Sequence, residues 1–374
     1  MNDGPTAAAT GLPAAMRAAV LTARGGPEVL VVRDDVPVPS VGPGEVLIAV
    51  SACGVNNTDI NTRVGWYSRA VTGGTSGEGF AEARVEDSTW GSGEFRFPRI
   101  QGADPCGRVV SVGRDVDAGL LGRRVVVDPW LRDPDDPGDR ARAGYLGSEL
   151  DGGFAEYCAV PAANVYPIVR GELGDVELAA LACSWSTAAH MLHRVDLGAG
   201  QRIAITGASG GVGSALVSLA ALRGATVVAV AGAAKRDAVA ALGADAVVAR
   251  GTNGTPERCR DAAGGALDVV ADVVGGADFG GWLDVLRRGG RYVTSGAIAG
   301  PIVELDLRTL YLNDLELIGA TVFEPQVFAD LVGLVNAGFV RPPVAATFPL
   351  DEIGAAQEMF GRKEHVGAIV ITIA

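Results

Sequence analysis

The sequence is poor in the residues that most often hold metal ions and covalent cross-links. It has 3 histidines and 5 cysteines in 374 residues, and the nearest two cysteines are Cys158 and Cys183. Because no Cys-x-x-Cys pair occurs, neither zinc fingers nor a dense disulfide framework fits this chain. We therefore expect free thiols and a cytoplasmic protein.

Long hydrophobic runs and an excess of positive charge are also missing. The most apolar stretch, residues 214–234, is interrupted by Arg223 and Gly224, which favours a helix followed by a strand over a membrane span. Residues 1–4 lack the basic and apolar regions of a secretory signal. A net charge of −13 argues against binding to nucleic acid phosphates. We predict neither a membrane partner nor a nucleic acid partner.

Glycine, by contrast, is abundant. The chain contains 53 glycines, and 48% of its residues are hydrophobic, which is ample material for buried cores. No Gly-x-y period occurs, so a collagen-like chain is excluded. The length favours two domains, and the glycines indicate many tight turns or close backbone approaches.

The first half of the chain has the pattern of a β region. Small and polar residues 1–15 are expected to form a flexible tail. Short Val- and Ile-rich segments then alternate with Gly/Pro turns, which is typical of a barrel-like all-β fold. Two long loops, 72–97 and 128–153, interrupt this region, and loops of such length often have a function. The expected strands include 17–22, 45–50, 108–112 and 124–127.

After residue 175, strands and helices alternate. Apolar strands separated by helices indicate a parallel, doubly wound sheet, so the predicted class is α/β. The expected strands are 202–206, 226–230, 246–249, 269–273, 291–295 and 316–321, and the expected helices are 176–197, 212–222, 236–242 and 279–286.

The strongest chemical signal is a glycine loop between a strand and a helix, Gly207-Ala-Ser-Gly-Gly-Val-Gly213. Gly210 can let the backbone approach a pyrophosphate, and Gly213 can let the helix pack closely on the strand. The amides at the start of that helix can then bind phosphate. We predict that a dinucleotide contacts Ala208, Ser209, Gly210, Gly211 and Val212.

The same letters also match G-x-S-x-G, the nucleophile elbow of serine hydrolases, with Ser209 as nucleophile and His365 later in the chain. However, no His-Gly-Gly-Gly oxyanion segment occurs, and an elbow does not need Gly213. Ser209 is better interpreted as a hydroxyl beside phosphate.

The type of dinucleotide is indicated at the end of the next strand. An NAD site would place an acidic residue there, but the sequence has Gly232 followed by Lys235 and Arg236. These bases suit the 2′-phosphate of NADP(H), and Gly232 and Lys235 are predicted contacts. Val274 and Gly296 follow later strands and are predicted neighbours of the nicotinamide.

Several segments, found in order along the chain, together resemble one family: 16–30, 42–47, 54–56, 100–104, 107–110, 151–157 and 207–213. The chain is similar to the medium-chain dehydrogenase/reductases, particularly their zinc-independent quinone oxidoreductase-like branch. The resemblance implies a GroES-like β-barrel catalytic domain, a Rossmann NADP-binding domain and a homodimer. The implied boundaries are 16–180 and 325–374 for the catalytic domain and 181–324 for the Rossmann domain.

The chain departs from the zinc-dependent members at their metal ligands. Asn56 replaces a ligand cysteine, Ala103 replaces a ligand histidine, and Cys183 alone matches. Because catalytic zinc needs about three protein ligands, we predict no metal. Relatives also often carry Gly-Lys before the last strand, where this chain has Gly367 and Ala368, so a lysine contact is missing.

The resemblance also implies roles for residues near the cofactor. Asn56 would lie beside the nicotinamide, Thr187 would line the floor of the cofactor site, and Tyr67 would line the pocket as a candidate proton donor. Thr58 matches the hydroxyl that begins the proton relay of alcohol dehydrogenases. The predicted catalytic residues are therefore Asn56, Thr58 and Tyr67.

The predicted substrate is a conjugated carbonyl, namely a quinone, an enone or a 2-alkenal, because hydrogen-bond donors can stabilise its spread charge without a metal. Pocket candidates are Asn61, Arg63, Trp66 and Trp90, and the 72–97 loop is either a lid or an exposed insertion. Two alternatives stay open: an NADPH-dependent carbonyl/alcohol oxidoreductase that uses Thr58, and a non-catalytic NADPH-binding sensor.

Overall fold

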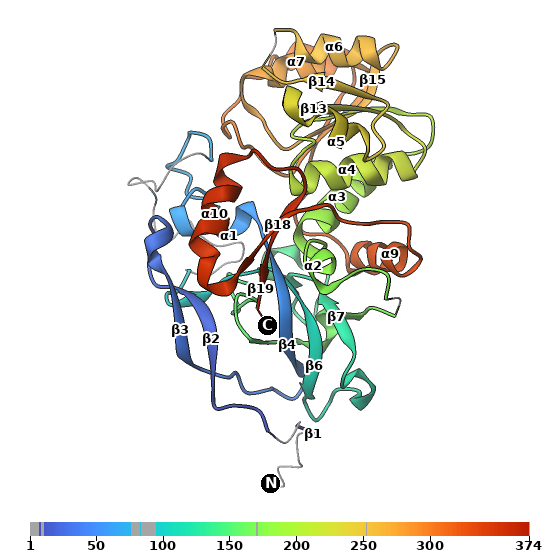
Figure 1. Cartoon of the computed structure of the whole chain (residues 1–374). Helices are drawn as coiled ribbons and strands as arrows, with labels where there is room; N and C mark the ends of the chain where they lie inside the picture. The colour runs from blue at the N-terminus through green and yellow to red at the C-terminus, as the bar shows by residue number, and fades with distance from the viewer. Residues whose placement is uncertain are drawn as a thin grey trace.

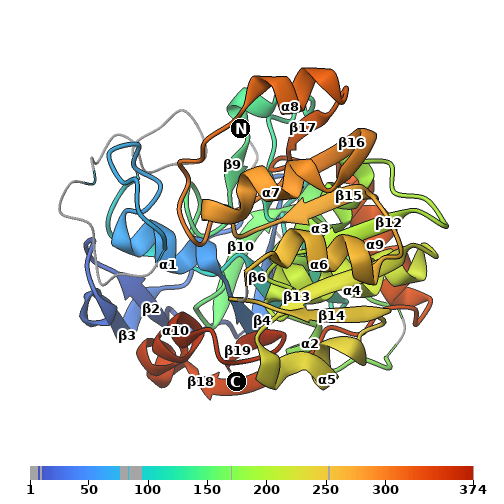
Figure 2. The same cartoon turned by 90° about the horizontal axis from the view of Figure 1, so that it is seen from above.

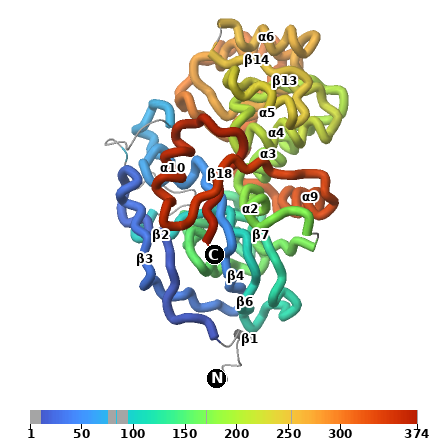
Figure 3. Tube along the Cα trace, in the orientation of Figure 1, coloured from blue at the N-terminus to red at the C-terminus, as the bar shows by residue number. Residues whose placement is uncertain are grey.

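The computed structural model describes residues 7–8, 11–75, 83, 95–169, 171–251 and 253–373. Two lobes are visible (Figure 1). The lower lobe contains the N-terminal half of the chain, and the upper lobe contains the yellow and orange segments that follow α3 (Ala182–Arg194). The red C-terminal segment leaves the upper lobe and returns to the lower one, as the Cα trace also shows (Figure 3).

The lower lobe is built on a mainly antiparallel sheet whose strand order is β11-β7-β6-β4-β19-β18. Its centre is β4 (Glu45–Val55), which pairs with β6 (Asp104–Val112) and with the C-terminal β19 (Ala368–Thr372). β4 is apolar at most positions, since it is covered on both faces. The other strands of this sheet are β1 (Ala7–Ala8), β7 (Arg124–Val127), β10 (Tyr157–Pro161), β11 (Val165–Pro167) and β18 (Val344–Pro349).

Two small sheets complete the β domain. The first has the order β3-β2-β5, and the second pairs β8 with β9 inside the 128–153 loop. Their bounds are β2 (Ala15–Leu21), β3 (Leu30–Pro37), β5 (Arg99–Ile100), β8 (Trp130–Leu131) and β9 (Gly144–Tyr145).

The upper lobe is a parallel six-stranded sheet with the order β14-β13-β12-β15-β16-β17. Numbered within the lobe, this is the 3-2-1-4-5-6 order of a Rossmann sheet, whose direction reverses between β12 and β15. The strands are β12 (Arg202–Ile205), β13 (Thr226–Ala231), β14 (Ala246–Ala249), β15 (Leu267–Asp272), β16 (Leu286–Thr294) and β17 (Glu316–Gly319).

Alternate side chains along these strands enter two different cores. Ile203 and Ile205 pack with helices α3, α4 and α9, whereas Ala204 packs with α6 and α7 on the opposite face. This two-sided burial explains the continuous apolar runs in the sequence. The covering helices are α4 (Gly211–Leu222), α5 (Arg236–Ala240), α6 (Thr255–Ala262), α7 (Phe279–Asp284), α8 (Leu307–Leu312) and α9 (Pro325–Asn336).

The structure confirms the predicted fold class, a GroES-like β domain with a Rossmann domain, but several of its helices differ from the predicted ones. The stretch expected as one helix at 176–197 is divided into α2 (Asp175–Leu178) and α3. Helix α6 was not expected, because its charged sequence buries few residues and shows no apolar stripe.

Two helices of the β domain lie beside the carboxyl ends of the parallel strands. Seen from above, α1 (Asn57–Val64) and α10 (Ile353–Arg362) flank the Rossmann sheet on one side (Figure 2). In a doubly wound sheet this edge is where ligands bind. No helix in the described parts of the chain combines the length and the apolar character needed to cross a bilayer.

Candidate functional site

Two adjoining pockets open between the domains. The first, which we call the inner pocket, has an empty volume of about 1060 Å³ and is lined by residues of α1, α3 and the glycine loop. The second, the outer pocket, has about 990 Å³ and lies over the ends of β13 and β14. These volumes include space open to solvent. Gly207, Gly210 and Ile298 line both pockets, so the two form one continuous cleft across the glycine loop.

The glycine loop is packed so tightly that side chains are excluded at particular positions. A Cβ at Gly213 would lie 2.1 Å from the carbonyl oxygen of Gly207, and a Cβ at Gly211 would lie 2.4 Å from Ser184 Oγ. At Gly210, by contrast, the nearest atom would be 3.6 Å away. Gly213 therefore packs the helix, as expected, and Gly210 leaves open space above the loop.

Helix α4 begins in this loop with its amides facing the cleft. Gly210 is the N-cap of α4, and Gly211 and Val212 of its first turn line the inner pocket. Ser209 lines the outer pocket. Ala208 is fully buried, and its backbone N–H bonds the Val230 carbonyl, so it lies behind the cleft wall. A pyrophosphate fits the remaining surface, because free amides and the helix dipole favour an anion.

Several basic side chains line the outer pocket. Lys235, Arg250, Lys363 and His365 all line it, together with Gly232. Lys235 Nζ donates to Ser209 Oγ at 3.2 Å and to the Lys363 carbonyl at 2.6 Å. Burial and the charge of Arg250 lower the pKa of Lys235, and Glu364 offsets this in part.

The basic residues of this pocket are not quite those that the sequence predicted. Lys235 lies in it as expected, whereas Arg236 is exposed and outside its lining. Arg250 takes that place, from the end of β14, where no motif singles it out. His365 shares the pocket with Ser209, but burial, Lys363 and Lys235 lower its pKa to about 4. A histidine held neutral among cations lacks the carboxylate partner of a serine hydrolase triad.

Lys363 connects the two pockets. It ends α10 in a left-handed conformation, lies over the Phe360 ring at 3.8 Å, and donates from Nζ to Asn57 Oδ1 at 2.7 Å. Burial and Lys235 lower its pKa to about 7. Position 368, where relatives often have a lysine, is an alanine in this chain. A different lysine, Lys363, lies five residues earlier and faces the cleft.

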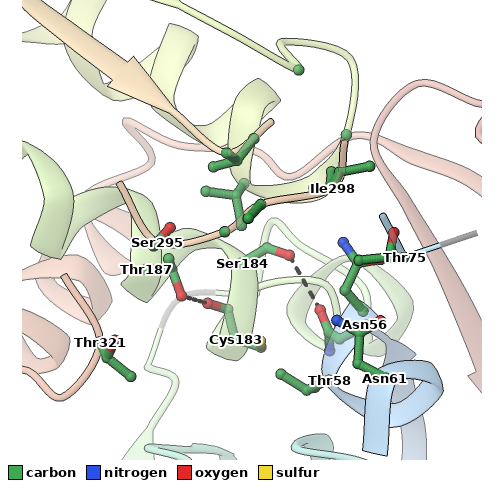
Figure 4. Close-up of a pocket in the computed structure, with 18 of the residues that line it drawn as sticks. Asn56, Thr58, Asn61, Thr75, Cys183, Ser184, Thr187, Ser295, Ile298 and Thr321 are labelled. Carbon is green, nitrogen blue, oxygen red and sulfur yellow. Dashed lines mark hydrogen bonds between the residues drawn. The ribbon is translucent and has the colours of Figure 1, made fainter. Parts of the chain in front are cut away.

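Asn56 lies where the β domain meets α3 (Figure 4). It is the N-cap of α1, and Ser184 Oγ donates to Asn56 Oδ1 at 3.2 Å. The backbone N–H of Asn56 donates to Asp59 Oδ2 at 2.8 Å, which fixes the start of the helix. Thr187 lines the same pocket, and its hydroxyl donates to the Cys183 carbonyl at 2.7 Å. Both predicted contacts therefore face the inner pocket.

Two buried carboxyl groups lie behind Asn56. Asp59 also accepts from the Gly102 backbone at 3.3 Å, and Asp104 accepts from the Cys183 backbone at 2.8 Å. Burial raises the pKa of Asp59 to about 7 and that of Asp104 to about 8. Neither residue was predicted to have a role, because the sequence around a single aspartate does not show whether its side chain is buried.

Residues of α1 and of the turn after it line one end of the inner pocket. Thr58, Asn61, Trp66 and Tyr67 all lie there, as predicted. The Tyr67 side chain bonds the Asn61 amide, and burial raises the pKa of its phenol above the usual range. Trp66 Nε1 donates to the Gly73 carbonyl at 3.0 Å.

One of the predicted pocket residues lies elsewhere, and another is not among the described residues. Arg63 is buried outside the cavity, where its Nε donates to Gln357 Oε1 at 2.9 Å and its Nη1 to the Gly25 carbonyl. Trp90 lies outside the described residues. Of the 72–97 loop, Thr75 lines the inner pocket and donates from its backbone to the Ile298 carbonyl at 3.0 Å. The start of the loop thus reaches the Rossmann domain.

A buried aspartate holds the cofactor-side loop after β15. Asp272 accepts from the backbone of Val274 at 2.7 Å and of Gly275 at 3.0 Å, and also from the hydroxyls of Thr206 and Tyr292. This arrangement places Val274 in the outer pocket, whereas Gly296 lines the inner pocket. Gly296 is therefore near the predicted nicotinamide site, and Val274 lies on the other side of the loop.

The residues present do not fit a catalytic zinc. In the part of the chain that the structure describes, no group of three or more His, Cys, Asp and Glu side chains could hold a metal. At the family's ligand positions, Asn56 bonds Ser184, Ala103 has no donor atom, and Cys183 is a thiol whose pKa is raised by burial. One thiol is too few ligands for a catalytic zinc, which needs about three.

Comparisons with known proteins cover nearly the whole chain. A family model described as an alcohol dehydrogenase GroES-like domain matches residues 42–170, and one described as a zinc-binding dehydrogenase matches residues 211–337. The quinone oxidoreductase of Lama guanicoe is 29% identical over 352 residues, which are 92% of this chain and 93% of that protein.

Solved structures give the same picture. A structure assigned as an alcohol dehydrogenase from Sinorhizobium meliloti 1021 has a TM-score of 0.87 and 43% identity, over 97% of this chain and 98% of that chain. A 2-octenoyl-CoA carboxylase reductase, solved with NADP and 2-octenoyl-CoA, has a TM-score of 0.82 and 26% identity, over 96% and 88%. The similar proteins thus include quinone, alcohol and enoyl-thioester oxidoreductases.

Proposed function

Because the chain belongs to the medium-chain dehydrogenase/reductase superfamily of NAD(P)-dependent oxidoreductases, we propose that it is an NADPH-dependent reductase of conjugated carbonyls that works without zinc. The observation that carries this proposal is the inner pocket, where amide, hydroxyl and thiol groups stand at and around the family's metal ligand positions. Quinones, enones and 2-alkenals are the substrates that such a pocket suits.

The outer pocket supports NADPH as the cofactor. A 2′-phosphate needs cations and no competing acid at the end of the second Rossmann strand. Gly232, Lys235 and Arg250 provide that combination, and Lys363 extends the positive charge toward the glycine loop. A carboxylate that would bond the ribose of NAD does not occur in the segment 230–236.

The chemistry asked of the protein is modest. Bound NADPH would supply the hydride. When hydride adds to the β-carbon of an enone, negative charge moves to the carbonyl oxygen, and fixed hydrogen-bond donors can stabilise it. Thr58 and Tyr67 offer hydroxyls to the pocket, and Asn56 is oriented by Ser184 beside the glycine loop. Trp66 and the start of the 72–97 loop help to exclude water.

A second candidate is an NADPH-dependent carbonyl/alcohol oxidoreductase. It is favoured by the position of Thr58 in the inner pocket, where its hydroxyl could begin a proton relay. The 43% identity to a protein assigned as an alcohol dehydrogenase points the same way. The missing zinc ligands argue against it, since an unactivated ketone needs a stronger electrophile than a hydroxyl group.

The deciding experiment is NADPH oxidation with quinones, 2-alkenals, enoyl thioesters and plain ketones, followed by product analysis. We expect turnover of the conjugated substrates, with a saturated aldehyde as the product of a 2-alkenal. An allylic alcohol would favour the carbonyl/alcohol alternative. Stoichiometric NADPH binding without any turnover would favour a sensor. One tightly bound zinc per chain in elemental analysis would contradict the zinc-free proposal.

We further propose that the protein is a homodimer joined along β17. This strand is the last in the order of the Rossmann sheet, and Leu317 on it is exposed. Leu307, Tyr311 and Leu312 of α8 are 63%, 62% and 55% exposed beside it. An apolar patch on a free sheet edge favours pairing with another strand, and a second copy offers the identical edge in a two-fold arrangement.

A further inference from the structure

Tyr145 brings a phenol to the part of the inner pocket where zinc-dependent members of the family have their metal ligands. Its side chain shares a hydrogen bond with the thiol of Cys183, the residue at the third ligand position. Ala103, at the second position, belongs to the same buried cluster as both residues. Tyr145 and Cys183 line the inner pocket. A hydroxyl donor therefore lies where the zinc-dependent members place an electrophilic metal.

The ring of Tyr145 is held from several sides. It packs edge-on against Trp130 with the ring centroids 4.8 Å apart, and the two residues pair between β8 and β9. Its backbone N–H donates to Glu149 Oε2 at 2.7 Å. Trp130, which lies on the partner strand, is held in turn, because Asn164 Nδ2 donates to its carbonyl oxygen at 2.8 Å. A side chain held this firmly can act as a preorganised donor.

The base of the same loop is tied to the domain boundary. Arg132 forms a largely buried ion pair with Asp128 at 2.7 Å. It also donates to the Phe323 carbonyl at 2.8 Å, and its guanidinium lies 5.5 Å from the centre of the Phe323 ring. Phe323 stands directly before α9, at the junction of the two domains. These contacts give the loop that carries Tyr145 a defined position relative to the glycine loop.

We propose that Tyr145 is a catalytic residue whose hydroxyl donates a hydrogen bond to the carbonyl oxygen of the substrate as negative charge forms there. This inference rests on the proposed reduction of conjugated carbonyls. The hydride forms a C–H bond at the β-carbon while the C=C electron pair moves to the bond between the α- and carbonyl carbons. The C=O electron pair moves to oxygen, where Tyr145 stabilises the enolate. A proton from water at the α-carbon completes the saturated carbonyl.

The surroundings of Tyr145 suit a donor that keeps its proton. Burial, Cys183 and the nearby carboxyl groups raise the pKa of the phenol well above 10, so the hydroxyl stays protonated throughout the working pH range. Its partner in the structure, a thiol, is a weak acceptor. Exchanging that thiol for an enolate oxygen therefore gains a much stronger, charge-assisted hydrogen bond.

Thr58 also lies close enough to the Cys183 thiol to lower its pKa, and the buried Thr58 hydroxyl has no hydrogen-bond partner among the described residues. The hydroxyls of Thr58 and Tyr145 thus converge on one point, which gives the substrate oxygen a second donor. Tyr67 differs, because the Asn61 amide donates to its phenol oxygen and so lowers the pKa of that phenol in part. The Cys183 thiol, by contrast, raises the pKa of the Tyr145 phenol. Both tyrosines line the inner pocket, so each serves as a comparison for the other.

The test compares three tyrosine-to-phenylalanine variants, each of which keeps its ring packing. We expect Tyr145→Phe to lower kcat by roughly 100-fold, the usual loss for one oxyanion donor, while the Kd for NADPH stays unchanged. Tyr67→Phe should lose less than Tyr145→Phe. Tyr166→Phe, in a half-buried tyrosine that packs on Phe328 away from both pockets, is the matched control. A kcat for Tyr145→Phe within threefold of the wild type would overturn the proposal.

A ligand that cannot be reduced separates this inference from the proposed function. Bound 4-nitrophenol reports its ionisation by absorbance, and a hydrogen bond from Tyr145 should favour the bound phenolate in the wild type over Tyr145→Phe by about tenfold. If the wild type reduces no conjugated carbonyl but shows this difference, the proposed function fails and the donor role stands. If the wild type reduces enones and the two proteins bind the phenolate equally, the donor role fails.

Discussion

At the scale of single residues, the proposed preference for NADPH over NADH depends on charge in the outer pocket. Lys235 is within hydrogen-bond distance of Ser209 and of the Lys363 backbone, and it faces Arg250 across the pocket. Its neighbour Arg236 is exposed and outside the lining. Two adjacent cations in the sequence thus have different surroundings, which provides a variant and its control.

We predict that Lys235→Met lowers kcat/KM for NADPH by about 10- to 100-fold, the worth of one charge-assisted hydrogen bond, and leaves the value for NADH nearly unchanged. Steady-state kinetics with both cofactors is the measurement. Arg236→Met should change neither value. Equal losses with NADPH and NADH, or an equal loss in Arg236→Met, would contradict the assignment of the 2′-phosphate to Lys235.

A buried carboxyl group gives a prediction about pH and stability. Burial raises the pKa of Asp104 to about 8, far above its ordinary value. At a pH between these two values, Asp104 is protonated in the folded protein and ionised in the unfolded chain. Its contribution to the free energy of unfolding therefore decreases as the pH rises. Asp59, His190, His365 and Lys363 also have shifted pKa values, so a single pH profile would mix several groups.

The Asp104→Asn variant isolates that group. Because asparagine cannot ionise, the variant should become more stable relative to the wild type by up to about 1.4 kcal/mol for each pH unit between pH 5 and 8. Chemical denaturation of both proteins at several pH values measures the difference. The exposed Asp35 gives a control, since Asp35→Asn should show no such trend. A constant difference between Asp104→Asn and the wild type would refute the buried proton.

At the scale of elements, the glycine loop and α4 separate packing from cofactor binding. A methyl group at position 213 would overlap the Gly207 carbonyl, whereas one at position 210 has space. Gly213→Ala should therefore destabilise the fold by about 1–3 kcal/mol, as overpacking does. Gly210→Ala should keep the melting temperature and weaken NADPH binding, which calorimetry and thermal unfolding can follow together. Unchanged NADPH affinity in Gly210→Ala would show that the cofactor does not approach this residue.

Elements differ in how well periodicity predicts them. The strands at 124–127 and 246–249 have the predicted bounds, because each is a short apolar run with turn residues beside it. The break between α2 and α3 was missed, since the residues between them are apolar and buried like the helices. Helix α6 was missed for the opposite reason, namely too few apolar residues.

At the scale of the whole molecule, the exposed apolar residues near β17 predict that the protein is a dimer and that charged residues there would convert it to a monomer. We expect a dimer in solution, and Leu317→Asp combined with Tyr311→Asp should produce monomers, because charges would be buried at the β17 edges. Light scattering after size-exclusion chromatography measures the mass. Phe339, in the segment that follows α9, is 65% exposed, and Phe339→Asp should leave the dimer intact. A wild-type monomer at micromolar concentration would contradict the proposed interface.

The amino-acid sequence by itself determined the fold class, the glycine loop and the loss of the zinc ligands, because these depend on local patterns and on residue identity at motif positions. The tertiary structure decided which side chains share a pocket. Arg250 and Lys363 line the outer pocket and Tyr145 lines the inner one, although they come from three distant segments that no local spacing relates. It also moved Arg63 and Arg236 out of the site, since the direction of a side chain depends on packing against neighbours that are remote in the chain.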